Sequence, residues 1–177
     1  MADAELSLDD LFQAHRRGLA GAVRSVLGGS AEVTELLQDA FLKCWRHWQN
    51  GERPRDPVAW IFVVVWNVAV DARRARQRRP NHASLDEDPT LTPTIHPSPA
   101  RALEQREQLA IAQHAIAGLS DPEQQVFLMR TSGELSFDAI AASLAIPVGT
   151  AKTRMRSALQ KLRHTLGARM GREESAR

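Results

Sequence analysis

Apolar residues recur at intervals of three and four along most of the chain, which is the spacing of one face of an α-helix. Turn-forming residues divide this pattern into separate helices. The first predicted helix begins after Ser7, a good N-cap residue, and ends at Gly28. The second runs from Ser30 to Asn50, with Gly51 after it. The beginning of the chain is therefore expected to be helical.

A third helix is predicted from Asp56 and Pro57, since proline suits the first position of a helix. Residues 58–70 carry no charge and are apolar nearly all round, so a buried strand is the alternative. A buried strand usually covers only about 4–8 residues, whereas this segment continues into an Ala-rich and Arg-rich extension. The length favours a helix that ends in an arginine cluster: Arg73, Arg74, Arg76, Arg78 and Arg79.

Residues 80–100 differ in composition from both sides of the chain. They contain five prolines and three acidic residues, and no Lys or Arg. Such a segment cannot bury a core and is typical of an extended, flexible linker. We therefore predict an all-α protein of two small helical domains, residues 1–80 and 101–177, joined by a Pro-rich acidic linker at residues 81–100.

The second domain shows the order of a helix-turn-helix. A helix from Pro99 to about Gly118 precedes a segment that begins with an S-x-x-E capping box, Ser120 with Glu123. A short helix then follows the candidate cap Ser136, and Pro147 interrupts the pattern before a longer final helix. A short helix, a turn and a longer helix in this order indicate DNA binding.

The final helix is amphipathic and cationic. Residues 139–172 contain seven Lys and Arg and no acidic residue. One face is an apolar stripe, and the opposite face mixes hydroxyl, amide and guanidinium groups, a combination that suits the major groove of DNA. The alternative is a solvated basic helix at the end of an ordinary bundle.

The net charge of the 177-residue chain is only +2, so its basic character is local. Residues 1–80 carry 12 Lys and Arg against 10 acids, and residues 101–177 carry 11 against 8. The cations gather in the arginine cluster and the last helix, as in a nucleic-acid binder.

Several function classes lack their characteristic residues. Cys44 is the only cysteine, and the six His lack ligand spacing, so we expect no metal site and no cofactor. The sequence has no Ser/His/Asp order, phosphate loop or carboxylate pair, and we expect no enzyme and no small-molecule substrate. The first ten residues do not resemble a signal peptide, and the 13-residue apolar run at 58–70 is too short to span a bilayer. We expect no membrane insertion.

Four segments in order carry a resemblance to a known family: ELLQDAFLKCWRHW, DPVAWIFVVVWNVAVDARRARQRR, LSDPEQQVFLMR and LSFDAIAASLAIPVGTAKTRMRSALQKLR. With the linker between the second and third, the chain resembles the extracytoplasmic-function (ECF) sigma factors of bacterial RNA polymerase from about Leu8 to Leu166. The resemblance implies an alternative sigma factor, with no reaction of its own, that binds core polymerase, recognises a promoter and helps to open the strands.

The resemblance assigns the core-polymerase contacts to the second helix, against the largest core subunit. Its candidate residues are Glu35, Leu37, Gln38, Asp39 and Phe41. Leu37 and Phe41 could equally be core residues, whereas Gln38 and Asp39 have no reason to be buried.

The third helix matches the family's minus-ten recognition element. The candidate DNA contacts are Trp66, Asn67, Asp71, Arg73, Arg74 and Arg76. Asp71 could instead pair with an arginine three residues later on its own helix. Trp66 stands where the family usually has a basic residue, and it is either a platform for an unstacked base or a core side chain.

The final helix matches the family's minus-thirty-five recognition helix. The candidate contacts are Thr150, Lys152, Thr153, Arg154, Arg156, Ser157 and Lys161. Ser157 stands where the family often has arginine. Ala145 stands at a turn position where the family often has glycine, at a cost of about 1 kcal/mol if φ is positive.

The resemblance also implies partners beyond promoter DNA and the largest and second-largest polymerase subunits. It predicts an anti-sigma factor, a role in stress response, and a place in the bacterial cytoplasm at the nucleoid, or at the inner membrane when the anti-sigma factor holds the protein there. The rival interpretation is a helix-turn-helix transcriptional regulator that does not join polymerase. The docking helix around Gln38 and Asp39 argues against that rival.

Overall fold

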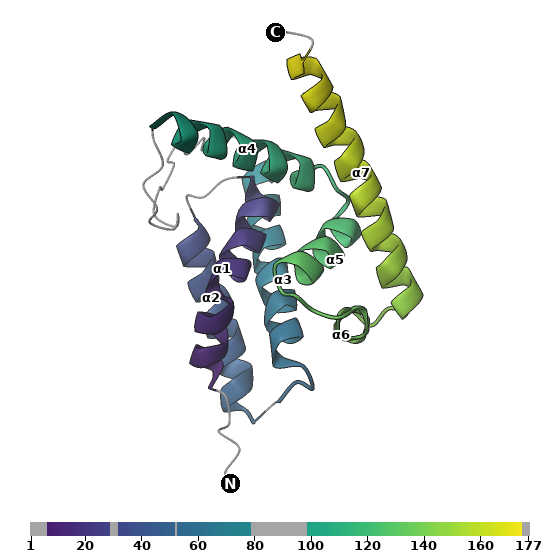
Figure 1. Ribbon diagram of the computed structural model, residues 1–177. Coiled ribbons are helices and arrows are strands. Elements are labelled where there is room, and N and C mark those ends of the chain that lie inside the picture. Colours follow the sequence, from purple (N-terminus) through teal and green to yellow (C-terminus); the bar gives the residue numbers. More distant parts are fainter. Residues whose placement is uncertain (1–6, 29–31, 52, 79–98, 175–177) are drawn as a thin grey trace.

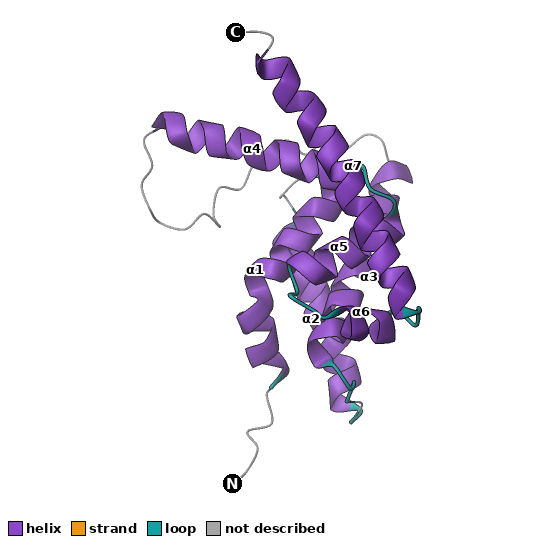
Figure 2. Ribbon diagram, turned by 45° about the vertical axis from the view of Figure 1, so that its right-hand side comes forward, coloured by secondary structure: helices purple, strands orange, loops and turns teal. Residues whose placement is uncertain are grey.

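The computed structural model describes residues 7–28, 32–51, 53–78 and 99–174, and all its regular elements are helices (Figures 1 and 2). The all-α prediction is confirmed. The predicted linker lies almost wholly outside the described residues. The helices are α1 (Leu8–Leu27), α2 (Val33–Gln49), α3 (Pro57–Arg78), α4 (Pro99–Ala117), α5 (Asp121–Thr131), α6 (Phe137–Ser143) and α7 (Val148–Glu174).

Local signals place the helix ends where the sequence predicted them. The Ser7 side chain accepts a hydrogen bond from the Asp10 backbone, and the Asp10 carboxylate accepts from Ser7 in return. Gly28 ends α1 in the left-handed conformation, with φ of 71°. The backbone nitrogen of Ser120 donates to Glu123 at the start of α5, which completes the second predicted capping box. Each such cap contributes about 1 kcal/mol.

The uncharged segment is the first part of α3, a continuous 22-residue helix, so the strand alternative is wrong. The Asp56 carboxylate accepts from the backbone nitrogen of Ala59 at 2.9 Å and caps the helix start. Phe62, Val65 and Trp66 are buried among the surrounding helices. An apolar surface on more than one side therefore reflects a helix covered on more than one side.

Helices α1, α2 and α3 lie side by side, and α5 and α6 pack against them (Figure 1). Helix α4 crosses one end of this bundle against α1, and α7 packs on the outer side of α4, α5 and α6. One continuous apolar core extends from α1–α3 into α5, α6 and the start of α7. The two predicted domains thus lie in direct contact, which the composition did not indicate.

The turn between α6 and α7 contains a strained backbone. Ala145 has a φ of 51°, in the left-handed region that alanine rarely occupies. Its side chain is exposed. Alanine at this position, where the family often has glycine, therefore lowers the stability of the fold.

Replacing Ala145 by glycine should raise the free energy of unfolding by about 1 kcal/mol, because glycine adopts positive φ without a Cβ clash. Chemical denaturation followed by circular dichroism measures the change. Ala142→Gly, at an exposed site inside α6, is the matched control. It should lower stability by roughly 0.5–1 kcal/mol, and an equal loss in both variants would contradict the account.

Candidate nucleic-acid and partner interfaces

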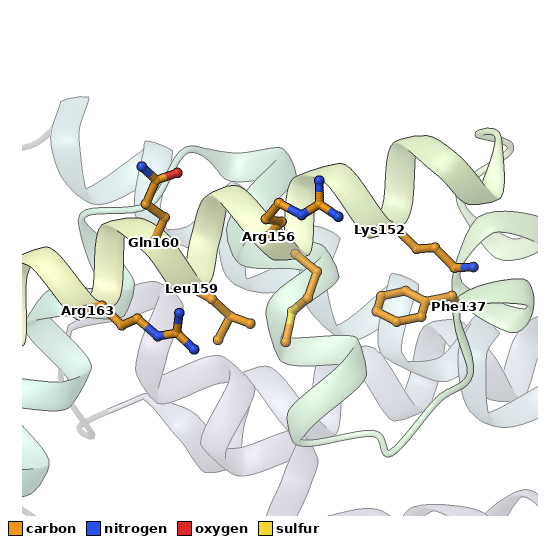
Figure 3. A pocket seen from close by; sticks show the side chains of 7 residues that line it. Phe137, Lys152, Arg156, Leu159, Gln160 and Arg163 are labelled. Atoms are coloured by element: carbon orange, nitrogen blue, oxygen red, sulfur yellow. The ribbon is translucent and has the colours of Figure 1, made fainter.

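A groove of about 550 Å³ lies along α7 next to the start of α6 (Figure 3). Phe137, Met155 and Leu159 give it an apolar surface. The remaining lining residues are polar or cationic: Lys152, Arg156, Gln160 and Arg163. Three positive charges therefore lie beside an apolar surface, and the groove contains two of the predicted minus-thirty-five contacts, Lys152 and Arg156.

Two other predicted contacts point to a different side of α7. Ser157 Oγ donates to Glu123 Oε1 at 2.6 Å, and Lys161 Nζ donates to Glu123 Oε2 at 2.8 Å. Glu123 is buried on α5, so these bonds attach α7 to α5. Neither Ser157 nor Lys161 lines the groove. Both side chains thus have a structural partner in the protein, and their contact with DNA stays a prediction.

The charge of Glu123 is favoured by this arrangement. Burial alone would raise the pKa of its carboxyl group. The hydrogen bonds from Lys161, Ser120 and Ser157 outweigh burial and lower the pKa from its ordinary value of 4.5 to about 2. The carboxylate therefore stays ionised, as its partnership with Lys161 requires.

The other predicted minus-thirty-five residues differ in accessibility. Lys152 and Arg156 are exposed, whereas Thr150 and Arg154 are partly buried. Thr153 is exposed, and its hydroxyl donates to the Gly149 carbonyl one turn earlier at 2.9 Å. Lys152 and Arg156 are accordingly the best placed of the predicted set, and Gln160 and Arg163 extend their row beyond what the sequence analysis named.

A second cleft, of about 300 Å³, lies between α2 and α3. Its lining residues are Lys43, Arg46, His47, Val64 and Asn67. Asn67 was predicted to contact the minus-ten element, but its three basic neighbours on α2 were missed. Their spacing along α2 puts them on one helical face, yet only tertiary packing brings that face to Asn67.

The other minus-ten candidates differ in burial and in the groups they contact. Trp66 is only 8% exposed and packs in the core, which is the second of the two alternatives considered for it. Asp71 is exposed. Arg74 lies 3.8 Å from Asp121 of α5 rather than pairing with Asp71 on its own helix.

Arg73 and Arg76 have acidic partners on other helices or loops. Arg73 donates to Asp121 at 2.6 Å and to Gln124 at 3.5 Å. Arg76 lies 3.1 Å from Glu32, which precedes α2. The arginine cluster therefore contacts acidic groups of the protein itself in this structure.

The predicted polymerase-binding residues share α2 with two more exposed apolar side chains. Gln38, Asp39 and Glu35 are exposed. Phe41 packs edge-on against Phe12, with ring centroids 5.1 Å apart, and Leu37 also packs on the core. Trp45 is 42% exposed, although it lies on a helix with apolar periodicity, and Leu42 is 49% exposed. Exposed apolar side chains beside Gln38 and Asp39 indicate a protein-binding surface.

The described part of the chain shows neither a cluster of metal ligands nor a membrane-spanning helix. No cluster of three metal-ligating side chains occurs among these residues. No described helix has the length and hydropathy needed to cross a membrane. Burial of Cys44 raises its thiol pKa to about 12, so this thiol stays protonated.

Comparison with known proteins places the chain in a family. Residues 11–79 match the family described as Sigma-70 region 2, and residues 115–164 match Sigma-70, region 4. The ECF RNA polymerase sigma factor SigL of Mycobacterium tuberculosis is 30% identical over 157 residues, which cover 88% of this chain and 86% of SigL. The chain belongs to the ECF RNA polymerase sigma factors.

A further relative is the ECF sigma factor RpoE of Cereibacter sphaeroides, 29% identical over 90% of this chain and 86% of its own. Two solved structures share the fold. The sigma factor RpoE of Bartonella quintana, solved with the anti-sigma factor NepR, has a TM-score of 0.65 at 20% identity, over 88% of this chain and 94% of that one. CnrH, solved with the cytosolic domain of CnrY, has a TM-score of 0.66 at 22% identity, over 91% and 88%.

The family membership assigns a role to the whole molecule. This ECF sigma factor is an alternative sigma subunit that binds core RNA polymerase and directs promoter recognition, strand opening and transcription initiation. The cleft with Asn67 falls in the region 2 match, and the groove along α7 falls in the region 4 match. The rival interpretation as a regulator that does not join polymerase is therefore wrong.

The Glu123 network gives a pH-dependent stability prediction. Glu123→Gln should lower the free energy of unfolding at pH 7 by about 1–3 kcal/mol, because it removes a charged acceptor from Ser157 and Lys161. Since the folded pKa is lowered from 4.5 to about 2, the stabilisation is present above pH 4.5 and is lost as the pH falls towards 2.

Urea denaturation at several pH values from 7 to 3 measures this effect. The difference in free energy of unfolding between the native sequence and Glu123→Gln should become smaller as the pH falls. Glu107→Gln, at an exposed position of α4, removes the same charge and is the control. Its free energy of unfolding should differ little from that of the native sequence at every pH. A difference for Glu123→Gln that stays constant with pH would contradict the stabilising role of the ionised Glu123 carboxylate.

Proposed function

We propose that this sigma factor divides promoter binding between the two cationic clefts, and that the α2 surface holds core polymerase. The observation that carries the proposal is their separation: Lys152 and Arg156 line the α7 groove, whereas Lys43 and Asn67 line the cleft between α2 and α3. Each cleft combines positive charge with groups able to recognise bases.

In the minus-thirty-five interaction, α7 enters the major groove. Lys152 and Arg156 contact base edges, and Arg163 contacts phosphate. Two exposed cations on consecutive turns of one helix suit guanine edges, where Arg and Lys are the commonest specific contacts. Gln160 adds an amide that can pair with adenine.

In the minus-ten interaction, the cleft between α2 and α3 receives a base that has left the stack. Extruding a base costs a few kcal/mol, which contacts in the cleft must offset. The Asn67 amide supplies a donor and an acceptor for the base edge, and Lys43 and Arg46 neutralise the flanking phosphates. Asp71 stands one turn further along α3.

Core polymerase contacts the α2 face that carries Gln38, Asp39, Leu42 and Trp45. Exposed apolar groups beside exposed polar ones are typical of a protein interface with a hydrophobic centre and a polar rim. We assign this face to the largest polymerase subunit.

The protein acts without a catalytic reaction of its own and works at the nucleoid in the bacterial cytoplasm. An anti-sigma factor is the regulatory partner. Support comes from the structural neighbour RpoE, which was solved together with the anti-sigma factor NepR. Run-off transcription with core polymerase on genomic fragments tests the whole proposal, and no specific transcript would contradict it.

Asp39→Ala should weaken binding to core polymerase and leave DNA affinity intact, because Asp39 lines neither cleft. Lys152→Ala with Arg156→Ala should do the reverse. The double change should lower affinity for minus-thirty-five DNA at least tenfold, because it removes two contacts to base edges. Polymerase pull-down and fluorescence anisotropy measure the two activities, and an equal loss of both in each variant would contradict the division.

Asn67→Ala should reduce strand opening about tenfold in the assembled holoenzyme, because a bidentate hydrogen-bonded contact to a base edge is worth roughly 1–3 kcal/mol. Permanganate reactivity of thymines at the minus-ten element measures opening. Gln77→Ala, exposed on α3 outside the cleft, is the matched control. Similar opening by both variants would remove Asn67 from the proposed site.

A further inference from the structure

The groove along α7 has an apolar floor as well as cationic and amide groups. Phe137, Met155 and Leu159 form this floor (Figure 3). Leu159 is 37% exposed, and it is one of four large apolar side chains that are exposed in the described part of the chain. DNA bound by the charged groups alone would leave this apolar surface in contact with water.

Contacts within the protein fix the position of the floor. The Arg130 guanidinium lies 5.4 Å from the centroid of the Phe137 ring and donates to the Leu135 carbonyl at 2.9 Å. Phe137 and Met155 also pack against the core. The floor is therefore a rigid surface, which can bind an apolar group at a low cost in side-chain entropy.

The apolar floor lies alongside the groups that were proposed to contact base edges. Figure 3 shows Arg156 and Gln160 leaving one side of α7 and Leu159 leaving the other. Arg156 and Leu159 are three positions apart in the sequence, so they are neighbours on the surface of the helix. A base that binds the Arg156 guanidinium would therefore have its neighbouring base over Leu159.

A ligand that fits the whole groove is anionic and carries an apolar group beside a hydrogen-bonding edge. Lys152, Arg156 and Arg163 favour an anion such as DNA. In the major groove the apolar group on a base edge is the C5-methyl group of thymine, which apolar side chains contact. A thymine beside the base bound by Arg156 thus matches both parts of the groove.

We propose that Leu159 recognises the methyl group of a thymine in the minus-thirty-five element, and that Phe137 and Met155 complete the apolar surface around it. This inference rests on the proposed binding of α7 in the major groove. Met155 and Leu159 lie about 6 Å apart along the helix axis, at about 1.5 Å per residue. Successive bases of one strand rise by about 3.4 Å, so the floor covers one or two neighbouring thymines. Leu159 is therefore a specificity-determining residue next to the base contacts of Arg156.

Replacing thymine by deoxyuridine removes only the methyl group and therefore tests this contact. The probe is a promoter fragment found by run-off transcription, with deoxyuridine placed at each thymine of the minus-thirty-five element in turn, on either strand. The thymine and deoxyuridine fragments give transcripts of different length and compete for a limiting amount of holoenzyme. At one or two positions we expect about fourfold fewer transcripts from the deoxyuridine fragment, which is the loss that one buried methyl group implies.

Leu159→Ala should abolish this preference, so that both fragments give equal numbers of transcripts, because alanine is too short to contact the methyl group. Leu109→Ala is the matched control, since Leu109 is an exposed leucine on α4 that does not line the groove. It should keep the preference of the native sequence. Both leucines are exposed, so neither change should prevent folding.

Equal transcript numbers at every thymine with the native sequence would overturn the proposal, and this comparison needs no variant. That result is expected if the floor contacts deoxyribose or an acidic protein segment instead. An unchanged preference in Leu159→Ala, or a minus-thirty-five element without A·T base pairs, would also overturn it. Failure of the proposed α7 site is a separate result, in which Lys152→Ala with Arg156→Ala leaves promoter binding unchanged.

Discussion

Two consecutive buried polar side chains in α5 hold the C-terminal helices to each other and to the N-terminal bundle. Glu123 accepts hydrogen bonds from Ser157 and Lys161 of α7, whereas Gln124 bonds to α1, α3 and α4. Buried polar groups are costly unless they are satisfied, so these bonds specify one arrangement of the helices. The position of α7, and hence of its groove, depends on Glu123.

This anchoring decides which cations of α7 remain for a ligand. Lys161 neutralises Glu123 at one side of the helix, while Lys152, Arg156 and Arg163 line the groove. A chain with a net charge of only +2 thus presents a concentrated positive surface, because residues 139–172 contain no acidic residue. On α3, Arg73 and Arg76 likewise contact acidic groups of the protein.

The sequence by itself determined the helices, their ends and the family. Caps such as Ser7 and Ser120 act within one helical turn, so a local pattern predicts them, and the strained Ala145 was recognisable from its place in the turn. Only the tertiary structure decided which faces are covered. Periodicity cannot distinguish an exposed Trp45 from a buried Trp66, because both lie on mostly apolar helices and only the neighbouring helices differ.

Contacts between residues far apart in the sequence could not be predicted from local patterns either. The bonds of Ser157 and Lys161 to Glu123 join residues 34 and 38 positions apart, and the contact of Arg73 with Asp121 joins residues 48 apart. The cleft around Asn67 forms only when α2 packs on α3. Spacing along a helix shows which residues share a face, but the face they meet depends on how the whole core packs.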